Sequence, residues 1–167
     1  MKREELQKFL SDFAADRLML LQRHEAGARA VSHYDFNNTY QYVINREETH
    51  MAWLQDALAE YGVPLPPPTR TLPVPQLAKF KKAEPSVFRE IVADDATQLG
   101  AFVTQWRPKV EAITHARHRR MLDVVLGESL EHKRFFEQAA NGFEDLLGRR
   151  TGGVAREGAV LPTRWME

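Results

Sequence analysis

The chain has 167 residues, with 23 basic side chains, 23 acidic side chains and no cysteine. The zero formal net charge argues against a uniformly basic nucleic-acid binder, and the lack of cysteine excludes disulfides, thiolate metal sites and thiol nucleophiles. No apolar run approaches the roughly 20 residues that a membrane-spanning helix needs. The composition therefore predicts a soluble, cytoplasmic protein without nucleic-acid or membrane partners, in which any metal would be held by His, Asp and Glu.

Two long helices are predicted before the proline-rich middle of the chain. Apolar residues recur at three- and four-residue spacing from residue 3 to about 30, and again over residues 36–61. Asp35 is placed to cap the second helix, and Gly62 to end it. Residues 62–85 are too rich in proline for a helix or a central strand, so they are expected to form a long crossover connection.

Two further helices are predicted after this connection. The third begins near Pro85, and its junction with the fourth falls within residues 107–117, because a proline interrupts an apolar stripe that continues beyond it. The fourth helix is expected to run to about Leu147, and residues 151–167 to form an irregular C-terminal tail. The sequence thus predicts an all-α four-helix bundle over residues 1–150, made of two helix hairpins joined by the crossover.

Charged and imidazole side chains interrupt the core-facing stripes of these helices. Glu47 and His50 lie one turn apart in the middle of the second helix's stripe. Glu128 and His132 lie one turn apart on the fourth helix, and Asp95 sits in the middle of the third. Burying an unpaired carboxylate is costly, and a metal ion satisfies a carboxylate and an imidazole together. The pattern therefore predicts a buried metal site.

The arrangement resembles the ferritin-like di-iron carboxylate family, including rubrerythrin-type proteins. In that family a Glu from each of two helices and a Glu-x-x-His from each of the other two hold two metals. Glu47 and His50 match the motif, whereas the segment from Glu128 to His132 departs from it. The resemblance implies two metal ions, iron before manganese, and an oxidoreductase or peroxidase-type reaction with dioxygen or peroxide. The ligands it implies are Glu25, Glu47, His50, Asp95, Glu128, Glu131 and His132.

Two ligand positions stay open on the sequence alone. The first helix offers Glu25, Asp16 or His24, and Glu25 ranks first because glutamate is the family's residue type. The second ligand of the fourth helix is Glu131 or His132, and the stripe position favours His132. Without cysteine there is no rubredoxin-like iron centre, so electrons would come from a separate donor protein. Nothing in the sequence excludes a homodimer.

Two other classes of protein fit the same residues. One is a metal-free bundle with a buried polar network, which would act as an interaction module rather than an enzyme. The other is a DinB-like bundle with a mononuclear site formed by His50, His132 and a third histidine, His24 or His118. The late His-x-x-x-His pair of that family is absent here. One zinc per chain would favour the DinB-like class, and two iron or manganese ions would favour the ferritin-like class.

Overall fold

The structure is a computed structural model that describes residues 2–75 and 85–148. Within these ranges the chain forms α-helices, one short 3-10 helix and no β-strand, so the prediction of an all-α four-helix bundle is confirmed. The predicted tail, residues 151–167, lies outside the described residues. The elements are α1 (Arg3–Ala30), α2 (Tyr34–Ala59), η1 (Pro85–Phe88), α3 (Arg89–Glu111) and α4 (Ala116–Ala140).

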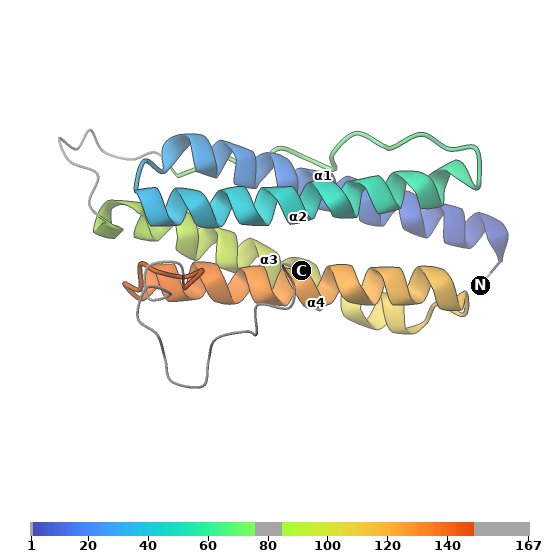
Figure 1. The fold of residues 1–167 in the computed structure, drawn as a ribbon. Coiled ribbons are helices and arrows are strands. Elements are labelled where there is room, and N and C mark those ends of the chain that lie inside the picture. The colour runs from blue at the N-terminus through green and yellow to red at the C-terminus, as the bar shows by residue number, and fades with distance from the viewer. Residues whose placement is uncertain (1, 76–84, 149–167) are drawn as a thin grey trace, which may run out of the picture.

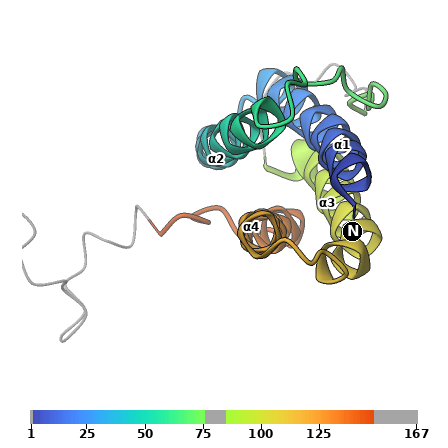
Figure 2. The ribbon, with the colours of Figure 1, turned by 90° about the vertical axis from the view of Figure 1, so that its right-hand side faces the viewer.

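The helices lie nearly along one axis as two antiparallel hairpins, α1 with α2 and α3 with α4 (Figure 1). Seen from the end, α1 packs on α3 and α2 packs on α4 (Figure 2). Because α2 and α3 run in the same direction, the chain has to return along the bundle between them. The described part of this connection lies beside α1, where the Thr69 N–H donates to the Ala15 carbonyl oxygen at 3.3 Å. Residues 76–84 of the predicted crossover lie outside the described residues.

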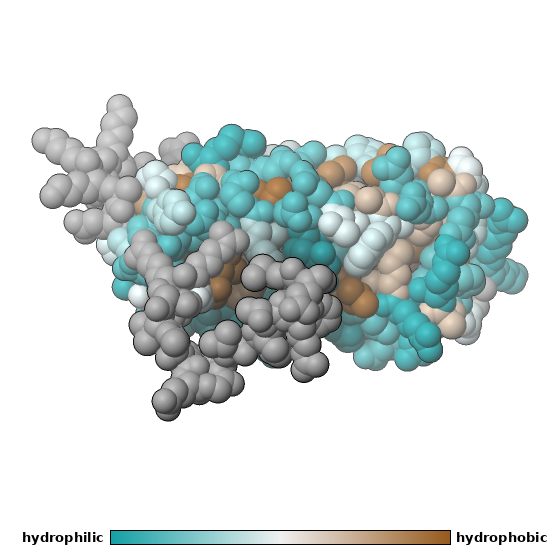
Figure 3. Space-filling model, viewed as in Figure 1, coloured by the Kyte–Doolittle hydropathy of each residue, from teal (hydrophilic) through white to brown (hydrophobic). Residues whose placement is uncertain are grey.

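The core forms where the apolar stripes of the four helices meet. Leu10 of α1, Leu54 of α2, Leu99 of α3 and Val125 of α4 are all fully buried. Each lies on the stripe that the helical period predicts, so burial of these stripes holds the bundle together. The outer face toward the viewer in Figure 3 is mainly hydrophilic. None of the described helices is both long and apolar enough to span a membrane.

One helix boundary, near Asp35, differs from the prediction, and the junction after Pro108 falls within the predicted range. The helix α2 begins at Tyr34 with His33 as its N-cap, so Asp35 lies in the first turn and is not the cap. The helix α3 continues through Pro108 to Glu111, and α4 begins at Ala116, so the junction lies within the predicted residues 107–117. Proline removes one helical hydrogen bond there, but burial of Val110 on the same face keeps the helix going.

The predicted end of the fourth helix, at about Leu147, is wrong. The helix α4 ends at Ala140, and Gly142 then adopts a φ of 93°, which glycine accepts without strain. The Phe143 N–H donates to the Gln138 carbonyl oxygen at 3.0 Å, as in a glycine-terminated helix end. The apolar spacing continues past this turn, but Phe143 is 65% exposed. Backbone geometry at Gly142 therefore overrides the periodicity.

Candidate functional site

Polar side chains from all four helices meet in the middle of the bundle, and we call this group the polar centre. Most of its members are fully buried, and only Glu128 reaches the surface. The group links α1 to α2 and to α3, and α2 to α4. Its members are Arg17, Arg23, His24, Tyr40, Glu47, His50, Asp95, Glu128 and His132.

Glu47 is held by two side chains of α1. Arg17 Nη2 lies 3.0 Å from Glu47 Oε1, and His24 Nδ1 lies 2.9 Å from both carboxylate oxygens. Burial alone would raise the pKa of Glu47, but Arg17 and His24 together lower this pKa to about 2. The carboxylate is therefore ionised and can only accept hydrogen bonds, so His24 Nδ1 must carry a proton.

His50 connects Arg17 to Glu128. Arg17 Nη2 donates to His50 Nδ1 at 3.1 Å, and a guanidinium cannot accept, so Nδ1 is the unprotonated nitrogen. The other nitrogen, Nε2, then carries the proton and donates to Glu128 Oε2 at 2.8 Å. Burial and the charge of Arg17 lower the pKa of His50 to about 4. The ring is consequently neutral at pH 7, with both of its nitrogens in use.

Arg17 therefore contacts both members of the predicted Glu-x-x-His ligand pair through one nitrogen, Nη2. The sequence reasoning missed this residue, although a clue was present. Arg17 lies four residues after Phe13 and three before Leu20, in the middle of the apolar stripe of α1. A cation on the core face of α1 was as informative as the carboxylate on the core face of α2.

Asp95 of α3 is also paired with an arginine of α1. Arg23 Nε donates to Asp95 Oδ1 at 2.8 Å, the Tyr40 hydroxyl donates to Oδ2, and His24 Nε2 lies 3.9 Å from Oδ1. Burial raises the pKa of Asp95, and the nearby His24 and Arg23 only partly oppose this shift. Burial and the Asp95 charge also raise the pKa of Tyr40 well above its usual value. The Tyr40 hydroxyl therefore stays protonated and acts as the donor.

Arg23 makes two further bonds besides the one to Asp95. Its Nη2 donates to Asp94 Oδ2 at 2.9 Å, and its Nη1 donates to the Pro73 carbonyl oxygen at 3.0 Å. The side chain is almost completely buried. Arg23 thus fastens α1 both to α3 and to the segment that precedes it.

Glu128 completes a set of three arginine–carboxylate pairs. Arg46 donates to it from Nε at 3.0 Å and from Nη2 at 2.6 Å, a two-bond geometry that strengthens the pair. Burial raises the pKa of Glu128, but the hydrogen bonds from Arg46 and His50 outweigh burial and lower it. The pairs are Arg17–Glu47, Arg23–Asp95 and Arg46–Glu128.

Two histidines of the polar centre keep nitrogens without a hydrogen-bond partner among the described residues. These atoms are Nε2 of His24 and both ring nitrogens of His132. Burial lowers the pKa of His132 to about 3, although Glu47 opposes the shift, so this ring is neutral at pH 7. A buried polar atom left without a partner costs about 1–3 kcal/mol. These nitrogens are therefore the atoms of the centre best suited to take a ligand.

Two of the predicted ligands lie outside the polar centre. Glu25 is half-buried on α1, and its side chain makes no ion pair or hydrogen bond with the described residues. Glu131 is exposed on α4, where its charge acts on Arg46. The structure therefore brings together Glu47, His50, Asp95, Glu128 and His132, and adds His24 from α1.

The other two alternatives, Asp16 and His118, serve other parts of the bundle. Asp16 accepts hydrogen bonds from Thr69 at 2.5 Å and from Trp106 at 2.9 Å, which ties α1 to the proline-rich segment and to α3. His118 lies in the first turn of α4, about 21 Å from His132 by the helical rise. Among the described histidines, the one that can join His50 and His132 is therefore His24.

A two-metal carboxylate site matches the polar centre in donor type but only partly in donor placement. The required buried carboxylates and neutral imidazoles are present, yet each carboxylate already has an arginine partner. Within the described ranges, three ligand atoms come within 4.8 Å of one another only in a different group, His33, Asp35 and Glu144. A metal ion would have to displace Arg17 to reach Glu47 and His50 together.

Comparison of the chain with models of known protein families, with curated proteins and with solved structures finds no match. Any functional conclusion therefore depends on the fold and the polar centre themselves.

Proposed function

We propose that the chain is a ferritin-like helical bundle that binds metal in its polar centre, with Glu47 and His50 as the first ligand pair. The observation that carries the proposal is that one Arg17 nitrogen contacts Glu47 Oε1 at 3.0 Å and His50 Nδ1 at 3.1 Å. The pair thus already presents two acceptor atoms to one cation. Metal ligands must be an ionised carboxylate and a neutral imidazole, and this pair has those protonation states at pH 7.

The arrangement of helices supports the ferritin-like form of this proposal. Two antiparallel hairpins with α2 and α3 parallel are the topology that a long crossover produces. The α4 helix adds Glu128 and His132, and α1 adds His24, whose Nδ1–H is fixed by Glu47. A histidine that donates one nitrogen to a carboxylate and leaves the other free is the usual form of an oriented metal ligand.

The charges of the polar centre support one divalent ion more strongly than the two that the resemblance implies. Release of Arg17 frees the charge of Glu47, and release of the partly exposed Arg46 frees that of Glu128. These two charges balance one divalent ion. A second ion would require Asp95 to give up Arg23, a buried side chain with three hydrogen bonds. Bound iron or manganese would supply chemistry with dioxygen or peroxide, with electrons from a separate donor protein.

The same ion pairs favour a second candidate, the metal-free bundle that acts as an interaction module. Arg17 is fully buried, and its charge and that of Glu47 compensate each other without a metal. In this alternative Arg17 is a permanent part of the core. The two candidates therefore make opposite predictions for a variant that lacks the Arg17 charge.

Metal analysis of four proteins separates the candidates. Protein from iron- and manganese-supplemented cells is measured for metal per chain as wild type, Arg17→Met, Glu47→Gln and the control Glu131→Gln, whose exposed carboxylate is on α4. A metal centre predicts about one more ion per chain in the wild type than in Glu47→Gln, and no change in the control. Metal titration should also show at least tenfold tighter binding in Arg17→Met. If the wild type and Arg17→Met hold no more metal than Glu47→Gln, the polar centre binds no metal and the interaction module is the correct function class.

A further inference from the structure

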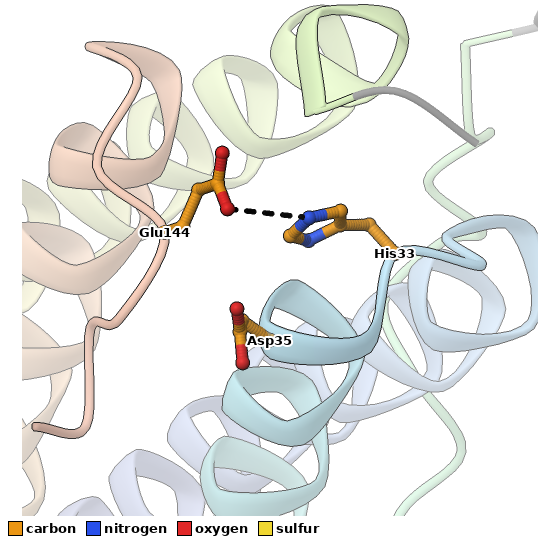
Figure 4. A group of neighbouring side chains, drawn as sticks. All are labelled: His33, Asp35 and Glu144. Carbon is orange, nitrogen blue, oxygen red and sulfur yellow. Dashed lines mark ion pairs between the residues drawn. The ribbon is translucent and has the colours of Figure 1, made fainter. Parts of the chain in front are cut away.

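A second group of metal-ligand side chains lies at the end of the bundle where α1 turns into α2. His33 precedes α2, Asp35 lies in the first turn of α2, and Glu144 follows α4 (Figure 4). One ligand atom of each lies within 4.8 Å of the other two. His33 Nε2 is 3.8 Å from Glu144 Oε2. We call these three residues the end cluster.

The backbone on both sides holds the end cluster together. The His33 ring packs on Phe36 with a centroid distance of 4.6 Å, which fixes the ring beside the first turn of α2. On the other side, the positive φ of Gly142 turns the chain back after α4 and brings Glu144 over this end of α2. Two segments far apart in the sequence thus supply the three side chains of the end cluster.

The charges of the end cluster are compensated differently from those of the polar centre. Within the described chain, the ion-pair partner of Glu144 is His33, with no arginine or lysine at this carboxylate. His33 Nδ1 is buried without a hydrogen-bond partner among the described residues. Asp35 is buried, whereas the Glu144 side chain is 46% exposed and free to adjust. The His33–Glu144 ion pair accounts for the 3.8 Å contact, and Asp35 places a second carboxylate beside this pair.

A cavity of about 220 Å³ lies beside the end cluster, lined in part by Asp35, Asn38 and Glu144. The cavity gives an ion bound by three protein ligands room for water at its remaining coordination position. Three protein ligands with one open position are common for zinc.

We propose that His33, Asp35 and Glu144 form a binding site for a zinc ion. One imidazole with two carboxylates suits zinc, iron or manganese, whereas calcium and magnesium prefer oxygen alone. Ligand atoms around a tetrahedral zinc ion lie about 3.4 Å apart at normal bond lengths. The 3.8 Å between His33 and Glu144 is close to this spacing, and rotation of the exposed Glu144 side chain can close the difference.

Zinc titration of the chelator-treated full chain by calorimetry at pH 7 tests the site. His33→Gln and Glu144→Gln should each weaken one zinc equivalent at least tenfold, because each removes a ligand. The matched control Asp145→Asn removes the neighbouring carboxylate of the same cavity and should change the affinity less than twofold. Glu47→Gln should leave this equivalent in place, which separates the end cluster from the polar centre.

Three results would overturn the proposal. They are unchanged zinc binding in both ligand variants, no zinc binding in a folded wild type, and an Asp145→Asn loss as large as that of Glu144→Gln, which would indicate a diffuse acidic patch. Circular dichroism checks that the variants keep the helical fold. Melting gives an independent measurement, since zinc should raise the Tm of the wild type by several degrees more than that of His33→Gln.

Discussion

The polar centre and the end cluster contain the same kinds of ligand side chain but differ in how their charges are compensated. In the centre, water cannot reach the carboxylates of Glu47 and Asp95, and arginines of α1 supply the opposite charges. At the end of the bundle, Glu144 is half-exposed, and its ion-pair partner among the described residues is a histidine. Buried charges need a partner from the chain or from a bound ion, whereas exposed charges are screened by solvent. A stripe of carboxylates and histidines therefore indicates a metal only after the core arginines have been counted.

The largest expected effect is the loss of stability when the Arg17–Glu47 pair is broken. Glu47→Gln leaves Arg17 buried without an ionised partner, so we expect the free energy of unfolding to fall by about 3–5 kcal/mol. Urea unfolding at pH 7 with chelator measures the change. The double variant with Arg17→Met should recover most of the loss, because it removes the unpaired cation.

The matched change in the end cluster, Glu144→Gln, should cost at most about 1 kcal/mol under the same conditions, since the carboxylate is half-exposed. Similar losses for Glu47→Gln and Glu144→Gln would show that the carboxylate charge contributes equally to stability in the two regions.

Acid should destabilise the polar centre before it affects the carboxylates. The pKa values of His50 and His132 in the folded chain are about 4 and about 3, below the ordinary 6.5. Below pH 6.5 the unfolded chain therefore binds protons that the folded chain does not, and stability falls as the pH falls. At pH 5 the loss is about 2 kcal/mol for each ring. Glu47 adds to the loss only below its ordinary pKa of 4.5, since its folded pKa is about 2.

Unfolding free energies at pH 7 and pH 5 test this prediction. His132→Leu removes one of the two titrating rings, so its loss between the two pH values should be smaller than that of the wild type by about 2 kcal/mol. Equal losses in the two proteins would mean that His132 is not buried in its neutral form.

A further pair of variants tests how closely the polar centre is packed. A Cβ atom at Gly27 would lie 2.9 Å from Tyr40 Cε1, and Tyr40 is buried and bonded to Asp95. Gly27→Ala should therefore cost about 1–3 kcal/mol in thermal or urea unfolding. Gly127→Ala, on an open face of α4, has nothing within 4 Å and should be neutral or stabilising by up to about 1 kcal/mol. Equal behaviour of both variants would mean that the Tyr40 ring can move aside.

The helices and the inward side chains of α2, α3 and α4 could be predicted because both follow from the helical period. Glu47, Asp95 and His132 all lie on apolar stripes, and all are buried. The ligand of α1 was harder to choose, since Glu25 is adjacent to His24 in the sequence but points about 100° away around the helix. Only the packing of α1 on α2 within the first hairpin decides which of the two faces Glu47.

The charge partners and the end cluster could not be predicted in the same way. Arg17 could be recognised on the stripe of α1, but its pairing with Glu47 depends on how α1 packs on α2. His33 and Glu144 lie in turns that carry no period, and they meet because Gly142 ends α4 early. Contacts of that kind arise from backbone geometry at the end of a bundle.

The three bonds of Arg23 also have a consequence for the order of folding. They join α1 to Pro73, Asp94 and Asp95, which lie 50, 71 and 72 residues farther along the chain. Bonds within the hairpins include ones that span only 23 residues, His24–Glu47, and 16 residues, Arg107–Asp123, and these close shorter loops. Long-range contacts form slowly because the chain must first pay a larger loop-closure entropy. We therefore expect both hairpins to assemble early, and their docking around Arg23 to set the rate at which the native bundle appears.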